Sequence, residues 1–322
     1  MTPQHTTSAF QWQGRIDAED SGPTPRWHQH VRPLAVDSHG GVTLIGFAVD
    51  EGVRRNAART GAAEGPHALR AALANLPVLG EPELHDAGDV HCENGALEAA
   101  QEALATRVAS ALERQSLPLV LGGGHEMAWG TFQGVVRALP AHKRLLIVNL
   151  DAHFDLREAS QGNSGTPFRQ MHAWCTAHAR PFNYRVFGIS EYANTQALFE
   201  RAQSMGVRHW LDDELQHPAG LEAARQALAT DLQACDAVYL TVCLDVLPGG
   251  QAPGVSAPAP LGVPLAAVQT LVDEVLASGR LVAADIAELN PSFDRDGLTA
   301  RVAARLVARV ARGVARHAAK AG

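Results

Sequence analysis

Short apolar runs and amphipathic segments follow one another along most of the chain. The apolar runs are rich in Val, Leu and Ile and are bounded by polar or Gly-bearing segments, which is typical of buried strands. They predict strands at residues 42–49, 83–90, 117–121, 145–148, 184–190, 207–211, 237–246 and 281–290. Between them, apolar residues recur at the period of a helix with one buried face. These segments predict helices at residues 66–73, 95–114, 193–205, 221–232 and 265–277, and two more that begin near residues 125 and 298.

Strands that alternate with helices, several of them apolar throughout, are typical of one parallel sheet covered on both faces. We therefore predict an α/β fold with three α/β/α layers, whose mostly parallel sheet has about eight strands. Residues 1–40 are polar and rich in Pro and His, which predicts an N-terminal arm packed on the body. No composition break or internal repeat divides residues 41–322, so we expect a single domain there.

Four predicted strands are followed directly by polar motifs. Ligands of open α/β sheets collect beyond the carboxyl ends of the strands, so these motifs should meet at one edge. They are GGGHE (122–126), DAHFD (151–155), CLD (243–245) and AELN (287–290). GGGHE alone is weak, because it also suits a tight turn with a helix-capping histidine. A phosphate-binding loop is disfavoured, since no Lys-Ser or Lys-Thr pair follows the glycines.

DAHFD is the strongest of these motifs. If the backbone is still extended there, Asp151, His153 and Asp155 point to the same side with a period of two. One imidazole and two carboxylates have the composition of a site for a hard or borderline divalent cation. The alternative is a strand end with solvated carboxylates and one hydrogen-bonded histidine. By the same period, Cys243 and Asp245 share a face, although a free cysteine is more often a small core side chain.

Charge and composition exclude several partners. The formal net charge is -7 and the sequence pI is about 6.1, which disfavours a nucleic acid or an acidic membrane as a partner. No apolar run is long enough to span a bilayer, and the N-terminus shows no secretory signal. The four cysteines form no CxxC pair, and we expect reduced thiols in a cytoplasmic protein.

Taken together, the motifs resemble those of the ureohydrolase (arginase/agmatinase) superfamily. The resemblance extends from about residue 40 to the C-terminus, and the formimidoylglutamases are the most similar members. The segments that carry it are GAAEGPHALRAALANLP, DAHFDLR, NSGTPF, FGISEYANT, CLDVLPGGQAPGVSAPA and AELNPSFDRDG. The resemblance implies an arginase-like fold and Mn-dependent hydrolysis of N-formimidoyl-L-glutamate to L-glutamate and formamide in histidine degradation. Hydroxide bridging two Mn(II) ions would attack the formimino carbon.

The resemblance also implies a ligand set for each of the two manganese ions. His125, Asp151 and Asp155 would hold one ion, while Asp151, His153 and Asp245 would hold the other. Cys243 stands where the family has a further bridging aspartate. Because a thiolate is softer than Mn(II) prefers, the first site is expected to bind weakly or to accept another metal.

Two carboxylates are assigned catalytic roles by the resemblance. Asp155 would move a proton to the leaving amine, and Glu288 would bind the positively charged amidine nitrogens, a charge-assisted contact. The alternative for Glu288 is a solvated residue at a strand end. Arg157 occupies the position that contacts the amino-acid end of the substrate in the family, and it could form a bidentate pair with a carboxylate. It could equally be a surface residue or pair with Glu158.

Substrate choice is also expected to depend on Ser164, which stands where arginase and agmatinase have a histidine. Loss of that histidine disfavours the guanidine-hydrolysing members. Further candidates for the substrate carboxylates are Arg54, Arg55, Arg59 and Arg169.

Two rival functions remain open from the sequence. One is another ureohydrolase that acts on a guanidino acid, such as a guanidinobutyrase or agmatinase. The other is a protein with this fold that has lost catalysis and acts by binding, which the cysteine at 243 favours. The resemblance further suggests a homo-oligomer, a trimer or hexamer, in which an arginine-striped C-terminal helix could take part.

Overall fold

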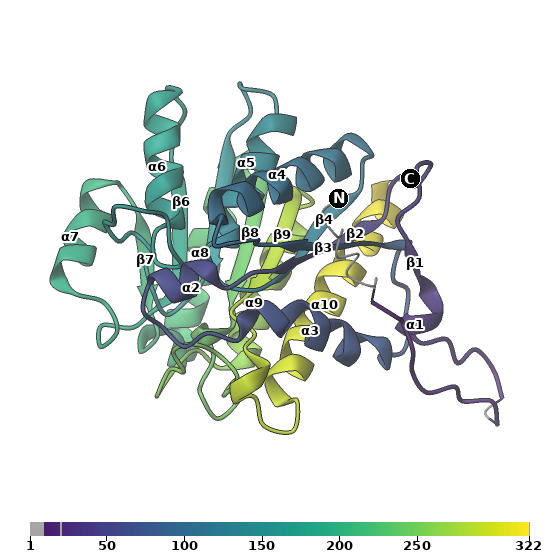
Figure 1. Cartoon of the computed structure of the whole chain (residues 1–322). Helices are drawn as coiled ribbons and strands as arrows, with labels where there is room; N and C mark the ends of the chain where they lie inside the picture. Colours follow the sequence, from purple (N-terminus) through teal and green to yellow (C-terminus); the bar gives the residue numbers. More distant parts are fainter. Residues whose placement is uncertain (1–9, 20, 322) are drawn as a thin grey trace.

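A single parallel sheet forms the centre of the molecule (Figure 1). The computed structural model describes residues 10–19 and 21–321, with residues 317–321 described by their backbone alone. The strands are β1 (Val31–Pro33), β2 (Val42–Ala48), β3 (Leu84–His91), β4 (Leu117–Gly122), β5 (Leu145–Leu150), β6 (Asn183–Ile189), β7 (Arg208–Leu211), β8 (Ala237–Cys243) and β9 (Leu281–Ala287). Their order in the sheet is β1-β3-β2-β4-β9-β8-β5-β6-β7, and every neighbouring pair is parallel.

Helices cover both faces of the sheet. The helices are α1 (Trp27–His30), α2 (Glu51–Arg55), α3 (Gly65–Ala74), α4 (Leu97–Glu113), α5 (Met127–Ala138), α6 (Pro167–Ala177), α7 (Gln196–Ser204), α8 (Pro218–Ala234), α9 (Leu265–Ala277) and α10 (Leu298–Ala321). Figure 1 shows α4, α5 and α6 on one side and α3, α9 and α10 on the other. The predicted α/β/α fold is confirmed. None of the described helices combines the length and apolarity needed to cross a membrane.

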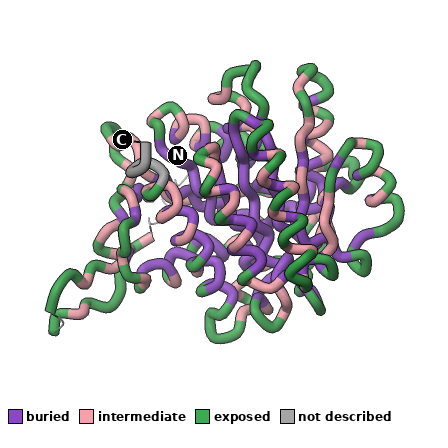
Figure 2. The backbone as a smooth tube through the Cα atoms, turned by 180° about the vertical axis from the view of Figure 1, so that it is seen from behind, coloured by how far each residue is buried: buried purple, intermediate pink, exposed green. Residues whose placement is uncertain are grey.

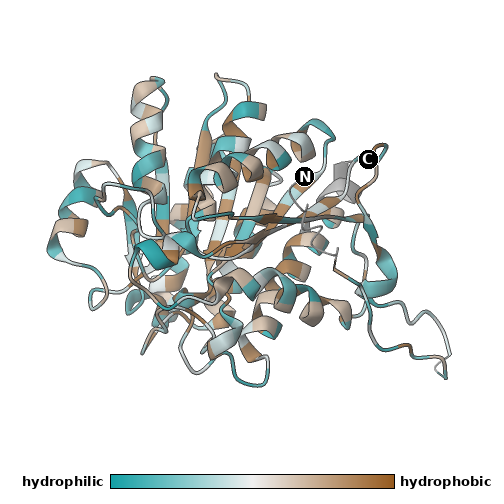
Figure 3. Cartoon of the chain, in the orientation of Figure 1, coloured by the Kyte–Doolittle hydropathy of each residue, from teal (hydrophilic) through white to brown (hydrophobic). Residues whose placement is uncertain are grey.

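The period of two along each strand builds two cores, one on each face. In β5, Leu146 and Val148 pack in the core under α3, α8, α9 and α10, while Ile147 packs in the opposite core under α4–α7. In β8, Leu240 and Tyr239 divide between the two cores in the same way. Buried backbone and apolar side chains therefore coincide at the sheet (Figures 2 and 3). This is why the strands appear in the sequence as continuous apolar runs.

The structure adds elements that the sequence pattern did not predict. β1 is a ninth, three-residue strand inside the predicted arm, paired with β3. Trp27 of the arm is fully buried. α6 begins at Pro167, in a Gly- and Ser-rich stretch that the pattern assigned to a loop. Proline at the first turn of a helix costs no hydrogen bond, so this helix starts where composition alone indicates a break.

Candidate functional site

Four neighbouring strands near the middle of the sheet end in the polar motifs. β4, β9, β8 and β5 are consecutive in the sheet, so the motifs at 122–126, 287–290, 243–245 and 151–155 lie side by side at the carboxyl edge. β4 and β5 are consecutive in the chain, but β8 and β9 separate them in the sheet. Such a switch in strand order is where open α/β sheets bind ligands. The prediction that the four motifs share one edge is confirmed.

The triple glycine allows three backbones to approach closely beneath the site. A Cβ at Gly122 would lie 2.5 Å from the carbonyl oxygen of Ile286 in β9, and one at Gly123 would overlap the carbonyl of Val49. The carbonyl of Gly123 also accepts a hydrogen bond from the N–H of Glu288, at 2.8 Å. The glycines are therefore needed for packing and bring His125 close to Glu288.

Among the described residues, two groups of side chains could hold a metal ion, and they share Asp151. His125, Asp151 and Cys243 form the first group, and Asp151, His153 and Asp245 form the second. The ligand atoms within each group lie within 4.8 Å of one another. Asp151 thus lies where a ligand common to two ions would have to lie. Asp155 is in neither group, but its Oδ2 lies 3.0 Å from Nδ1 of His125.

The imidazole of His125 contacts β8 through Nε2 and directs Nδ1 into the site. Its Nε2 lies 2.9 Å from the hydroxyl of Thr241 on β8. Its Nδ1 lies 3.0 Å from Oδ2 of both Asp151 and Asp155, yet it makes no directed hydrogen bond to either. A buried nitrogen aimed between two carboxylates suits a shared cation, because each oxygen and the nitrogen can then act as a ligand.

The second group has one side chain at the mouth of the site. Nδ1 of His153 lies 3.1 Å from Oδ2 of Asp245 and 3.5 Å from Oδ1 of Asp151. The side chain of His153 is 23% exposed, whereas those of Asp151 and Asp245 are buried. Oδ1 of Asp245 is buried and has no hydrogen-bond partner among the described residues. The second group is therefore buried at Asp151 and Asp245 and partly exposed to solvent at His153.

Buried negative charge dominates the electrostatics of the site. Burial by itself would raise the pKa of Asp151, but the imidazoles of His125 and His153 hold it well below its usual range. Burial and the neighbouring Asp151 raise the pKa of Asp155 to about 6. Burial raises the pKa of Glu288 to about 7. Divalent cations would compensate these carboxylates, so the donor set fits such ions.

Cys243 is buried at the end of β8, within the first group of ligands. Burial and the surrounding carboxylates, chiefly Asp245 and Asp151, hold the pKa of its thiol well above the usual range. The structure thus places the cysteine beside His125 and Asp151, in the first group alone. The set of donors is otherwise made of imidazole and carboxylate groups, which suit Mn(II) better than a thiolate does.

The predicted reason for the convergence of these side chains was wrong, although they do converge. β5 ends at Leu150, so Asp151, His153 and Asp155 lie in a loop and not on an extended strand. Asp155 has a φ of 50°, in the left-handed region that only a few non-Gly residues adopt. Likewise, Asp245 lies in a short 3-10 helix (Leu244–Val246) that follows β8. Loop geometry, and not the period of two, brings the ligands together.

The loop after β5 continues into the predicted substrate-binding residues. The N–H of Arg157 donates to the carbonyl of Gly165 at 2.8 Å, which joins the two ends of the loop. No ion pair connects the exposed guanidinium of Arg157 to a described residue, while Glu158 pairs with Arg169 and Arg201. Arg157 is therefore available to an anionic ligand beside the site.

The other arginines that were candidates for binding the substrate carboxylates already make contacts within the chain. Arg54 and Arg55 both pair with Glu51, and Arg55 also pairs with Glu98. Arg169 lies 3.4 Å from Glu158, and Arg59 donates to backbone carbonyls. Ser164 is buried, and its Oγ accepts a hydrogen bond from Nδ2 of Asn56 at 3.0 Å. The structure thus leaves Arg157 with a guanidinium that has no acidic partner among the described residues.

Several polar residues that the motifs did not include support the candidate ligands. Asn149 donates to Oδ2 of Asp151 at 3.0 Å, and Thr241 contacts His125. Both are fully buried polar residues inside apolar strands, two positions before a motif, and this pattern was a usable signal. Asn194 and Ser256 also contact the site, but they come from irregular loops. No periodicity distinguishes these two loop residues from solvated ones, although both lie in segments that carry the family resemblance.

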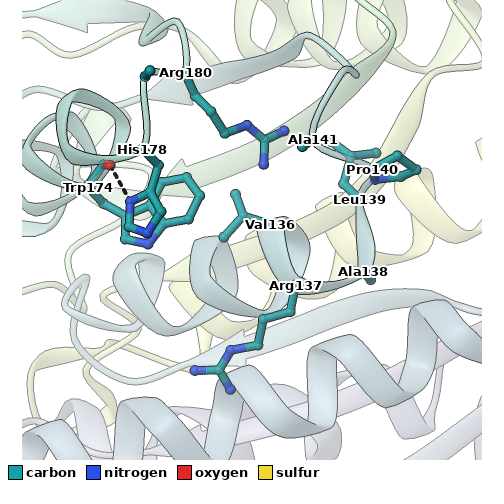
Figure 4. Close-up of a pocket in the computed structure, with 10 residues that line it drawn as sticks. Val136, Arg137, Ala138, Leu139, Pro140, Ala141, Trp174, His178 and Arg180 are labelled. Carbon is teal, nitrogen blue, oxygen red and sulfur yellow. Dashed lines mark hydrogen bonds between the residues drawn. The ribbon is translucent and has the colours of Figure 1, made fainter.

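A hollow lies away from the candidate ligands, and Figure 4 shows the residues that line it. It has a volume of about 660 Å³ and lies between the ends of α5 and α6, near the amino ends of β5 and β6. Trp174 stacks on His178 with ring centroids 4.1 Å apart, and the guanidinium of Arg180 lies 5.8 Å from the indole. These contacts close the last turn of α6, and the hollow contains none of the candidate ligands.

Sequence comparisons match most of the chain to known proteins. A model of the arginase family matches residues 41–312. A formimidoylglutamase from Ralstonia nicotianae is 52% identical over 317 residues, which cover 97% of each chain. A formimidoylglutamase from Aeromonas hydrophila is 51% identical over 300 residues, covering 92% of this chain and 95% of that protein.

Solved structures share the fold. A Trypanosoma cruzi formiminoglutamase crystallised with Mn²⁺ aligns with a TM-score of 0.79 and 26% identity, over 91% of this chain and 99% of that one. A Bacillus subtilis formimidoylglutamase aligns with a TM-score of 0.81 over 93% of this chain and 96% of that one. Its 21% identity is informative about the fold alone.

Proposed function

The chain belongs to the arginase family, and from this premise we propose that it hydrolyses N-formimidoyl-L-glutamate to L-glutamate and formamide. The observation that carries the proposal is the sharing of Asp151 between two groups of potential metal ligands at the switch point of the sheet. Relatives at 51–52% identity over nearly the whole chain support the choice of substrate.

The proposed cofactor is a pair of Mn(II) ions in each subunit. His125, Asp151, Asp155 and Cys243 would hold one ion, and Asp151, His153 and Asp245 would hold the other. When bound, the metal pair lowers the pKa of water so that hydroxide is available near neutral pH. The manganese in the Trypanosoma cruzi relative supports this choice of metal.

Asp155 would carry out the proton transfers of the reaction. Hydroxide adds to the formimino carbon, and the bond from that carbon to the glutamate nitrogen then breaks. Asp155 takes up a proton from the attacking oxygen and passes it to the leaving amine, which departs as L-glutamate. The position of Asp155 suits both steps, because its Oδ2 lies 3.0 Å from Nδ1 of His125, among the proposed metal ligands and not at a distance from the reacting atoms. Formamide retains the other nitrogen.

Glu288 and Arg157 would bind the two ends of the substrate. The Glu288 carboxylate is buried beside His125 and would accept hydrogen bonds from the cationic amidine. Arg157 lies on the adjoining loop and would pair with a substrate carboxylate. Ser164, held by Asn56, would line the same end of the pocket, where a guanidine-hydrolysing member has histidine.

We further propose that the enzyme is a cytoplasmic homo-oligomer, either a trimer or a hexamer. The four free cysteines, Cys92, Cys175, Cys235 and Cys243, support a reducing compartment. Two arginines of α10, the arginine-striped C-terminal helix, form ion pairs within the chain. Arg309 pairs with Asp273, and Arg312 pairs with Glu81. Arg301, Arg305 and Arg316 remain exposed and could contact another subunit.

The decisive experiment is a formamide-release assay on N-formimidoyl-L-glutamate with and without added Mn(II). We expect release that depends on Mn(II) and no urea from guanidino acids. Urea from guanidinobutyrate without formamide from the formimino substrate would establish the rival hydrolase. A folded protein that binds no metal by elemental analysis would instead favour a non-catalytic binding protein.

A further inference from the structure

We propose that Ser256 and Arg59 form a positioning pair that fixes the Glu288 carboxylate for the amidine end of the substrate. This inference rests on the proposed function and adds two residues to the same site. Ser256 lies in the segment CLDVLPGGQAPGVSAPA, to which the sequence assigned no role at this position, and Arg59 was a candidate for the substrate carboxylates. The structure shows different contacts for both.

The Glu288 carboxylate is held at both of its oxygens. Oε1 accepts a hydrogen bond from the backbone N–H of His125 at 2.9 Å, and Oε2 accepts one from the hydroxyl of Ser256. Glu288 is 4% exposed and has a φ of 69°, a conformation that costs free energy unless the surroundings maintain it. A carboxylate accepts about four hydrogen bonds, so about two acceptor positions remain for the two amidine nitrogens.

The loop that carries Ser256 depends on Arg59. Nε of Arg59 donates to the carbonyl of Ser256 at 2.9 Å, and Nη2 donates to the carbonyl of Val255 at 2.6 Å. The same guanidinium lies 4.0 Å from the ring centroid of Phe293, which holds its plane. Ala257 and Pro258, which follow, are exposed and belong to no helix or strand. The Arg59 guanidinium therefore helps to fix the backbone that carries Ser256, and the Ser256 hydroxyl also lies 3.2 Å from the carbonyl oxygen of Arg59.

Arg59 is itself fixed from the strand end that carries Glu288. Nδ2 of Asn290 donates to the carbonyls of Arg59 and Thr60, at 3.1 and 3.0 Å. The loop after α2, the Ser256 loop and the end of β9 are thus joined around one carboxylate. The guanidinium of Arg59 donates hydrogen bonds to two backbone carbonyls and lies over the ring of Phe293. Arg59 is therefore a positioning residue and not a ligand of the substrate carboxylate.

The test compares two small probes, one for each end of the substrate, on the Mn-loaded enzyme. Acetamidinium carries only the amidine group, and L-glutamate carries only the carboxylates. Ser256→Ala leaves Oε2 of Glu288 without its donor, so acetamidinium should inhibit about tenfold more weakly and KM should rise about as much, with a smaller change in kcat. Inhibition by L-glutamate and the Mn content should not change. Ser256→Thr retains the hydroxyl and should restore acetamidinium inhibition.

Arg59 is tested in the same assay. Arg59→Ala should weaken acetamidinium inhibition in the same direction, and it should add little in the Ser256→Ala background because the two residues act in series. Arg54→Ala is the matched control, since this guanidinium lies close by in the chain but pairs with Glu51. Arg157→Ala should show the opposite pattern, with weaker L-glutamate inhibition and normal acetamidinium inhibition.

The outcomes separate the two proposals. A wild-type enzyme that releases formamide, together with a Ser256→Ala variant that binds acetamidinium normally, would overturn this inference alone. Equal loss of both probes and of Mn in Ser256→Ala would also overturn it, because the residue would then be only structural. Wild-type protein with no activity on N-formimidoyl-L-glutamate would overturn the proposed function and this inference together.

Discussion

Cys243 is the residue at which the chemistry of the site departs most from what Mn(II) prefers. Its thiol is buried among carboxylates and belongs to a group with His125 and Asp151. A neutral thiol is a poor ligand for a hard cation, and a thiolate here would add negative charge to a crowded site. We therefore predict that this residue limits how tightly the first of the two proposed ions is bound.

Replacement of this cysteine tests that conclusion. Cys243→Asp should tighten Mn(II) binding by about tenfold, because a carboxylate is the harder ligand. Metal titration followed by elemental analysis measures the effect. Cys92→Ser is the control, since Cys92 belongs to neither ligand group, and it should bind Mn(II) normally. Unchanged affinity in Cys243→Asp would mean that the thiol binds as well as a carboxylate or does not bind at all.

At the scale of elements, the loop after β5 owes its shape to a neighbouring loop. Oδ1 of Asn194 accepts a hydrogen bond from the N–H of Phe154, and its Nδ2 donates to the carbonyls of Ala152 and Ser190. Asn194 is buried and follows β6, which pairs with β5. The turn after one strand thus holds the loop that carries Asp151, His153 and Asp155.

Removal of this contact should loosen the loop without unfolding the sheet. Asn194→Ala leaves buried backbone groups unpaired, which should cost about 1–3 kcal/mol of stability and also weaken Mn(II) binding. Asn194→Asp retains the acceptor for Phe154 but loses both donors, so its effect should be intermediate. Thermal unfolding and metal titration measure the two effects. Lower stability with normal Mn(II) affinity would show that the loop keeps its shape without Asn194.

At the scale of the whole molecule, the fold buries several carboxylates at one edge of its sheet. Asp151, Asp245 and Glu288 are all buried there, and Asp155 lies beside them. Like charges in a buried site destabilise the folded state unless cations compensate them. Bound metal should therefore stabilise the entire domain, because ions that bind only the folded state shift the unfolding equilibrium.

Metal removal gives a direct measure of this effect. Dialysis against a chelator should lower Tm by about 5–10 °C, for ions held at about 100 times their Kd. Added Mn(II) should restore the original value. Asp151→Asn removes the ligand that both groups share, so its Tm should hardly respond to the chelator. A wild-type Tm that is equal with and without chelator would contradict metal-linked stability.

Much of the fold followed from local sequence pattern. All eight predicted strands are present, because a buried parallel strand must be apolar on both faces and so appears as a continuous run. The ninth strand, β1, has three residues and too short a pattern to be recognised. α6 was missed because Gly, Ser and Pro precede it, and only the packing of Phe168 and Met171 selects a helix there.

The residue types at the site were determined by the sequence alone, and so was their position after apolar strands. Tertiary structure decided which strands are neighbours, and thus that His125, Asp151, Cys243 and Asp245 meet. It also decided that Asp155 and Glu288 adopt a left-handed backbone conformation. In the same way, it decided that Arg59 donates to the carbonyl of Ser256 and does not bind a substrate carboxylate. The physical reason is that the periodicity of a segment depends only on its local environment. Strand order and loop shape depend instead on contacts between residues that are far apart in the chain.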